Sequence, residues 1–106
     1  MTETILDEKI SVTIDEKIER ILSEPGKYKV VFLNDEKTPI EWVVEVLKQI
    51  FKHSQEVAEK ITLTIHEEGS GIAGIYTYEI AEQKTNEATV ASRNHGFPLQ
   101  IRLEKE

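Results

Sequence analysis

A change of hydrophobic period around residue 34 restricts most strongly what this chain can fold into. Residues 28–33 (YKVVFL) form an apolar run that is typical of a strand. A polar cluster follows at residues 34–37, and beyond it apolar residues recur at helical spacing. We therefore predict a strand over 28–33 and a helix over about 39–52. The helix has its apolar positions at Ile40, Val43, Leu47, Ile50 and Phe51.

Thr38 and Pro39 are expected to start this helix. Thr38 and Glu41 have the spacing of a capping box, in which each side chain accepts a hydrogen bond from a free backbone N–H of the first turn. Pro39 would then occupy the first helical position, where its missing N–H costs nothing. By spacing alone, residues 34–38 are most simply a connecting loop, because Asn and Asp side chains bond nearby backbone in turns.

A second helix is predicted after Ser54, which can cap it. Its apolar face would hold Val57, Ala58, Ile61 and Ile65. Residues 61–65 (ITLTI) also alternate as a strand would, and periodicity alone does not separate the two structures; the preceding residues 55–60 favour helix.

The last part of the chain predicts a strand, a helix and a strand. Residues 67–71 are expected to form a turn, and residues 72–78 a strand with a close backbone approach at Gly74. A helix over 79–93 would end at the stop Asn94-His95-Gly96. Leu99, Ile101 and Leu103 alternate with polar residues in a final strand. The element order predicts an α+β domain in which a small sheet is covered on one face.

Residues 1–26 differ from the rest of the chain in being highly charged and ending in the breaker Ser-Glu-Pro-Gly. They also contain an apolar stripe at helical spacing, formed by Ile10, Ile14, Ile18, Ile21 and Leu22. We predict that residues 1–26 are a flexible N-terminal extension with some helical tendency and that residues 27–106 form one folded domain.

Composition excludes several classes of protein. The chain has 106 residues, the size of one small domain, and a net charge of −7, which argues against nucleic acid as a partner. It has no cysteine and therefore no disulfide or thiolate chemistry. No apolar run approaches the ~20 residues of a membrane span, and the N-terminus lacks the basic start and apolar core of a secretory signal. We expect a soluble cytoplasmic protein with no membrane partner.

Candidate catalytic groups are few. None of the three histidines, at positions 53, 66 and 95, has another His or Cys at metal-ligand spacing. No serine lies in a nucleophile motif, and no phosphate-binding loop is present. We predict a protein that is not an enzyme and that needs no metal or cofactor. A small hydrolase using His66 and Asp35 is the enzymatic alternative.

Several motifs resemble the ClpS family, the adaptors that deliver N-degron substrates to the bacterial Clp unfoldase–protease. The resemblance covers about residues 27–104. It rests on YKVV at 28–31, NDEKTPIEWVV at 34–44 and VL at 46–47. Further matches follow in order: IHE at 65–67 with Gly69, TYEIAE at 77–82 with Lys84, and PL at 98–99.

The resemblance implies a fold, a function and partners. The fold would be a three-stranded antiparallel sheet packed against three helices in the order βααβαβ, preceded by a mobile extension. The protein would bind the free first residue of a substrate, when it is Leu, Phe, Tyr or Trp, and deliver that substrate to the N-terminal domain of a ClpA-type AAA+ unfoldase. It would be a monomer when free. The alternative is a regulatory domain of the same fold that binds the unfoldase without recognising N-degrons.

The resemblance also implies roles for individual residues. The α-amino group and backbone of the substrate would be bound by Asn34, Asp35, Glu36, Thr38 and His66. An apolar pocket for the first side chain would be lined by Ile40, Val43, Thr62, Ile65 and Leu99. The unfoldase would dock on Glu79, Glu82 and Lys84. Three positions depart from the family pattern: position 36 is usually Asp, and positions 40 and 62 are often Met.

Overall fold

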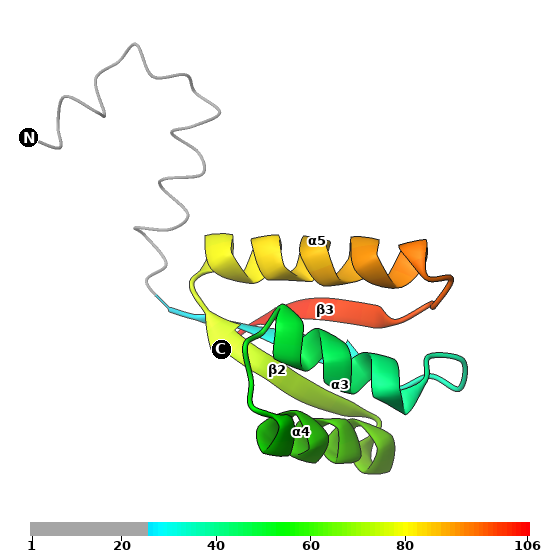
Figure 1. The fold of residues 1–106 in the computed structure, drawn as a ribbon. Coiled ribbons are helices and arrows are strands. Elements are labelled where there is room, and N and C mark those ends of the chain that lie inside the picture. The colour runs from blue at the N-terminus through cyan, green and yellow to red at the C-terminus, as the bar shows by residue number, and fades with distance from the viewer. Residues whose placement is uncertain (1–25) are drawn as a thin grey trace, which may run out of the picture.

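The computed structural model describes residues 26–106, which form three strands and three helices (Figure 1). Their order is β1 (Tyr28–Leu33), α3 (Ile40–Gln49), α4 (Gln55–Glu68), β2 (Ser70–Tyr76), α5 (Tyr78–Asn94) and β3 (Gln100–Lys105). This order confirms the predicted α+β class. The predicted N-terminal extension, including its stripe from Ile10 to Leu22, lies outside the described residues apart from Gly26.

The sheet is antiparallel, and its strand order is β2-β1-β3. The first strand of the domain therefore lies in the centre, where Tyr28 pairs with Tyr76 on one side and with Lys105 on the other. A central strand is covered on both edges, which suits the most apolar run of the chain. Val30 and Phe32 are accordingly buried completely.

The helices cover one face of this sheet, as predicted (Figure 1). The core joins β1 to side chains from α3, α4 and α5: Val43, Val46, Leu47, Ala58, Ile65, Ala81 and Ala88. The opposite face is more polar and more open. Ile72 is 44% exposed there, and the Lys29 Nζ lies 3.9 Å from a carboxylate oxygen of Glu104 on the neighbouring strand.

The start of α3 differs from the prediction. Pro39 is the N-cap residue, with an extended backbone, and α3 has no side-chain cap. The expected capping box between Thr38 and Glu41 is therefore wrong. The physical reason is that Asp35 competes with the helix for Thr38. Asp35 accepts hydrogen bonds from both the backbone N–H and the hydroxyl of Thr38. The helix also ends earlier than expected, at Gln49.

Helix α4 resolves the ambiguity at residues 61–65 in favour of helix. Ser54 caps it as predicted, its Oγ accepting a hydrogen bond from the Val57 N–H at 3.2 Å. The helix continues to Glu68 and ends at Gly69, whose φ of 90° is left-handed and suits glycine. The turn expected over 67–71 is thus shorter, and β2 begins at Ser70 and ends at Tyr76.

A close approach at Gly74 is confirmed. A Cβ atom at this position would collide with the ring of Tyr76. The final two elements follow the prediction closely, α5 being one residue longer at each end than expected. Leu99 precedes β3 instead of lying in it, and only 1% of its surface is exposed.

Candidate functional site

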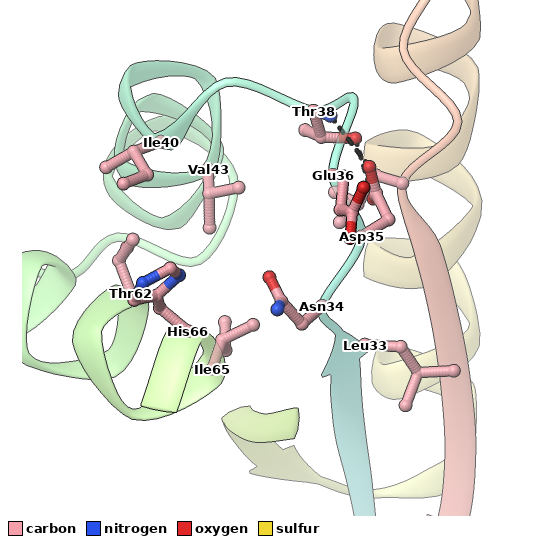
Figure 2. A pocket seen from close by; sticks show the side chains of 11 residues that line it. Leu33, Asn34, Asp35, Glu36, Thr38, Ile40, Val43, Thr62, Ile65 and His66 are labelled. Carbon is pink, nitrogen blue, oxygen red and sulfur yellow. Dashed lines mark hydrogen bonds between the residues drawn. The ribbon is translucent and has the colours of Figure 1, made fainter. Parts of the chain in front are cut away.

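A cavity of about 330 Å³ opens where β1 ends, between the loop at 34–39 and the helices α3 and α4 (Figure 2). Its lining includes every residue that the sequence predicted for the amine-binding and pocket groups. The complete set is Leu33, Asn34, Asp35, Glu36, Thr38, Ile40, Val43, Thr62, Ile65, His66 and Leu99. Leu33 was missed by the sequence analysis, although its place directly before Asn34 could have suggested it.

The apolar lining comes from three separate elements. Val43 lies on α3, Ile65 on α4, and Leu99 directly before β3, and these side chains are only 6%, 4% and 1% exposed. Because they also belong to the core, their positions are held by close packing. The cavity therefore has a rigid apolar wall that can bury an apolar group of a ligand.

Thr62 adds to this wall less polarity than its residue type suggests. Its hydroxyl donates a hydrogen bond to the Ala58 carbonyl oxygen at 2.7 Å within α4. The donor is therefore already used, and the residue is 95% buried, since only 5% of its surface is exposed. Thr62 acts in the cavity as a small wall residue.

Asn34 and His66 form the polar part of the site. Their side chains point toward one another across the cavity (Figure 2). The Asn34 N–H donates to the Gly69 carbonyl oxygen at 2.9 Å, which fixes the start of the loop against the end of the helix that carries His66. Both side chains are exposed, and neither has a hydrogen-bond partner within residues 26–106. Both can accept a hydrogen bond from a ligand.

Asp35 lines the cavity and also forms hydrogen bonds within its own loop. Its Oδ1 accepts hydrogen bonds from the Lys37 and Thr38 N–H groups, both at 2.7 Å, and its Oδ2 accepts one from the Thr38 hydroxyl at 2.8 Å. Burial by itself raises the pKa of the Asp35 carboxyl, but these hydrogen bonds and the positive charge of Arg93 outweigh it, so the pKa is lowered. The carboxylate therefore stabilises the conformation of the loop at 35–38.

Glu36 is the exposed negative group on the rim. It lies beside Asp35 in the loop, and its carboxylate has no hydrogen bond to another residue of the described chain. It can therefore supply negative potential at the cavity mouth, a role that Asp35 shares only in part.

We expect Asp35→Asn to lower the free energy of unfolding by about 1 kcal/mol at pH 7, because charge-assisted bonds that hold the loop are lost. A carboxyl whose pKa is lowered by folding stabilises the protein above its ordinary value of 3.8, and this contribution disappears as the pH falls through the lowered value. The difference between wild type and variant should therefore be constant from pH 7 to about pH 5 and shrink toward pH 3. Urea unfolding of both proteins at several pH values measures this difference. A difference at pH 3 as large as at pH 7 would contradict the stabilising role of the ionised Asp35 carboxyl.

The three predicted docking residues lie on α5, apart from the cavity. The Lys84 Nζ donates to the Ile50 carbonyl oxygen at 2.8 Å and lies 5.5 Å from the centre of the Tyr76 ring and 5.9 Å from that of Phe51. Glu82 accepts a hydrogen bond from the Tyr78 hydroxyl at 3.3 Å, and Glu79 is exposed. Lys84 thus also joins α5 to the end of α3.

Between residues 26 and 106, no helix is both long and apolar enough to cross a bilayer. The same part of the chain contains no group of three or more His, Cys, Asp or Glu residues placed to hold a metal ion.

Comparisons with known proteins agree on one family. The family model described as "ATP-dependent Clp protease adaptor protein ClpS" matches residues 23–102. The ATP-dependent Clp protease adapter protein ClpS of Cupriavidus metallidurans is 45% identical over 93 residues, which are 88% of this chain and 86% of that protein. The ClpS of Burkholderia thailandensis is 41% identical over 101 residues, covering 95% of this chain and 97% of its own length.

A solved structure has the same fold. It is the structure of Agrobacterium tumefaciens ClpS2 bound to L-phenylalaninamide, which is 40% identical and has a TM-score of 0.75. The match covers 77% of this chain and 99% of the Agrobacterium chain.

Proposed function

We propose, since the chain belongs to the ClpS family of Clp protease adaptors, that its cavity binds the free N-terminal residue of N-degron proteins and that it delivers them to a ClpA-type unfoldase. The observation that carries this proposal is the cavity itself, in which the Asn34 amide and the His66 ring face one another above an apolar wall. L-Phenylalaninamide, the ligand of the Agrobacterium ClpS2, has two groups that suit such a cavity, an α-amino group and a benzyl side chain.

The polar groups suit an α-ammonium. Free α-amino groups have pKa values of about 7.7–8.0, so most are charged at pH 7 and present donors that an internal residue lacks. The Asn34 side-chain oxygen and an unprotonated nitrogen of His66 are acceptors on opposite sides of the cavity. Glu36 adds negative potential at the rim.

The apolar wall suits the first side chain. Burial of a Leu or Phe side chain is worth roughly 1.5–3 kcal/mol, and each charge-assisted hydrogen bond to the amine adds about 1.5–3 kcal/mol. After the costs of association, a dissociation constant of about 1 μM is expected. A free amine and an apolar side chain must both be present, which is the definition of this class of N-degron.

A titration with peptides that differ only in their first residue tests the proposal. Peptides that begin with Phe, Leu, Tyr or Trp should bind with dissociation constants of about 1 μM, and those that begin with Asp, Lys or Gly at least tenfold more weakly. The apolar wall provides no partner for a charged first side chain. Equal affinities across the series would refute N-degron recognition and favour a regulatory domain that binds only the unfoldase.

Ile40 is expected to restrict which first residues enter. It lies at the mouth of the cavity and is 55% exposed, so its truncation costs little stability. Ile40→Ala should enlarge the mouth and increase the affinity for Val- and Ile-initiated peptides about threefold or more, with less change for Phe, because β-branched side chains are wide next to the backbone. Val90→Ala, which truncates a 59% exposed residue on α5, is the control and should change nothing. An unaltered specificity profile of folded Ile40→Ala would show that position 40 is not a gate.

The unfoldase contact proposed for this chain is the start of α5, with Glu79 and Glu82 and with Lys84 next to them. It is separate from the cavity, whose lining includes no residue of α5. An adaptor needs this separation, because it must hold its cargo and its partner at the same time.

A further inference from the structure

A second hollow begins at the mouth of the cavity and runs between α3 and α4. Its first part has a volume of about 170 Å³ and is lined by Ile40, Val44, Glu59, Thr62, Leu63 and His66. Three of these residues, Ile40, Thr62 and His66, also line the cavity. A second part of about 320 Å³ adds Glu41, Glu45 and Gln55. We call this continuous hollow the α3–α4 groove.

The floor of the groove is apolar and open to solvent. Ile40 from α3 is 55% exposed and Leu63 from α4 is 54% exposed, and half-buried Val44 lies between the two helices. Apolar side chains gathered in a concave surface can bury the aliphatic part of a ligand. Because the cavity and the groove share Ile40, Thr62 and His66, a peptide that leaves the cavity on this side would lie along the floor of the groove.

The rim of the groove is acidic, and its charge is not neutralised within the described chain. Glu45 and Glu59 accept hydrogen bonds only from neutral amides, from Gln49 at 3.0 Å and from Gln55 at 2.6 Å. The nearby cation, Lys48, donates to the Gln55 side-chain oxygen at 2.7 Å instead of pairing with a carboxylate. An apolar floor with unneutralised carboxylates matches a side chain that has a long aliphatic stem and a positive end.

We infer that the α3–α4 groove binds a Lys or Arg side chain at the third position of the peptide. The inference rests on the proposed function, in which the first side chain fills the cavity. Successive side chains of an extended peptide alternate in direction, so the first and third point to the same surface, about 6.6 Å apart. The stem of the basic side chain lies on Ile40 and Leu63, and its charge lies near Glu59 and Glu45.

Peptides of the form Phe-Ala-Xaa, otherwise identical, test the groove. With Lys as Xaa, we expect affinity about fivefold higher than with Ala and more than tenfold higher than with Glu at low salt. Norleucine, which keeps the stem and lacks the charge, should lie between Ala and Lys. The same substitutions at the second position, which points away, should change affinity less than twofold.

Variants of the protein distinguish binding in the groove from the general electrostatic attraction of basic peptides to a negatively charged protein. Since the whole chain has a net charge of −7, any basic peptide is attracted to some extent. Glu45→Gln with Glu59→Gln keeps the size of the side chains and should reduce the preference for Lys over norleucine to less than twofold. Glu87→Gln removes an exposed charge on α5 and should leave the preference for Lys over norleucine as it is in the wild type. Leu63→Ser should lower the affinity for the Lys and norleucine peptides by similar factors.

The outcomes show whether the groove proposal alone fails or the proposed function fails as well. Equal affinities for Lys, norleucine and Ala at the third position would overturn the groove, as would a Lys preference that survives the double variant as it survives Glu87→Gln. An equal preference at the second position would also overturn it. If the Phe-Ala-Ala peptide itself does not bind, the proposed function fails, and the groove with it.

Discussion

Acetylation of the N-terminus of a Phe-initiated peptide is expected to weaken binding at least a hundredfold. Acetylation removes the positive charge and leaves a single amide N–H, while the side chain that fills the cavity is unchanged. The loss of two charge-assisted hydrogen bonds costs about 3 kcal/mol, which corresponds to a hundredfold change in affinity. Calorimetric titration of the free and acetylated peptides measures it. Equal affinities would place the amine outside the cavity.

The protein side of the same prediction concerns Asn34 and His66. Asn34→Ala and His66→Ala should each weaken binding by more than about 1 kcal/mol, because a donor of the ammonium loses its acceptor. Both residues are exposed, so the variants should remain folded, which circular dichroism can check. Asn86→Ala, an exposed asparagine on α5, is the matched control and should bind normally. Wild-type affinity of both site variants would remove these residues from the site.

Hydrophobic pattern predicted most of the fold because the strongest patterns coincide with the most buried elements. The run at 28–33 became the central strand, where both edges are paired and Val30 and Phe32 are completely buried. The second helix was predicted in spite of strand-like alternation at 61–65, since the preceding residues 55–60 favour helix, and the predicted cap by Ser54 is present. In these elements the local residue preferences and the pattern of apolar residues indicate the same structure, and that structure also buries the apolar residues.

The start of α3 could not be predicted because two local interactions compete for the same residue. Thr38 has the spacing to cap the helix, and Asp35 has the spacing to bond Thr38. Spacing does not show which of them forms. The observed bonds to Asp35 leave Thr38 outside the helix and make Pro39 the N-cap.

The site illustrates a different limit. Asn34 and His66 are far apart in the sequence, and neither pattern nor composition brings them together. Their opposition depends on the hydrogen bond from the Asn34 N–H to the Gly69 carbonyl oxygen, a contact between a loop and a helix end. Only the resemblance to a family predicted this pairing, and the α3–α4 groove, which requires the packing of two helices, was not predicted at all.

Reversal of charge at Glu79 and Glu82 is expected to slow degradation of a Phe-initiated substrate by the partner protease at least tenfold, with no change in peptide affinity. A tenfold loss corresponds to about 1.4 kcal/mol, which is within the effect of like charges placed at a docking surface. Both residues lie on α5, and neither lines the cavity. Degradation rates with the partner protease and peptide titrations, measured on the same Glu79→Lys, Glu82→Lys protein, separate delivery from binding.

Stability has to be measured on the same protein. The lysine at position 79, in the first turn of α5, opposes the helix dipole at a cost of about 0.3–1 kcal/mol. Glu82→Lys removes the acceptor of the Tyr78 hydroxyl. Each kcal/mol of lost unfolding free energy lowers the melting temperature by roughly 4–8 °C in a domain of this size. The degradation assay should therefore be run well below the melting temperature of the variant.

Lys84 must be tested apart from these two residues, because it also supports the fold. Lys84→Glu would remove the hydrogen bond to the Ile50 carbonyl oxygen and place a carboxylate beside the rings of Phe51 and Tyr76. We expect its melting temperature to fall, so that slower degradation by this variant would not identify a docking contact. The contact is decided by Glu79 and Glu82, since undiminished degradation by that folded double variant would refute docking at the start of α5, whatever Lys84→Glu does.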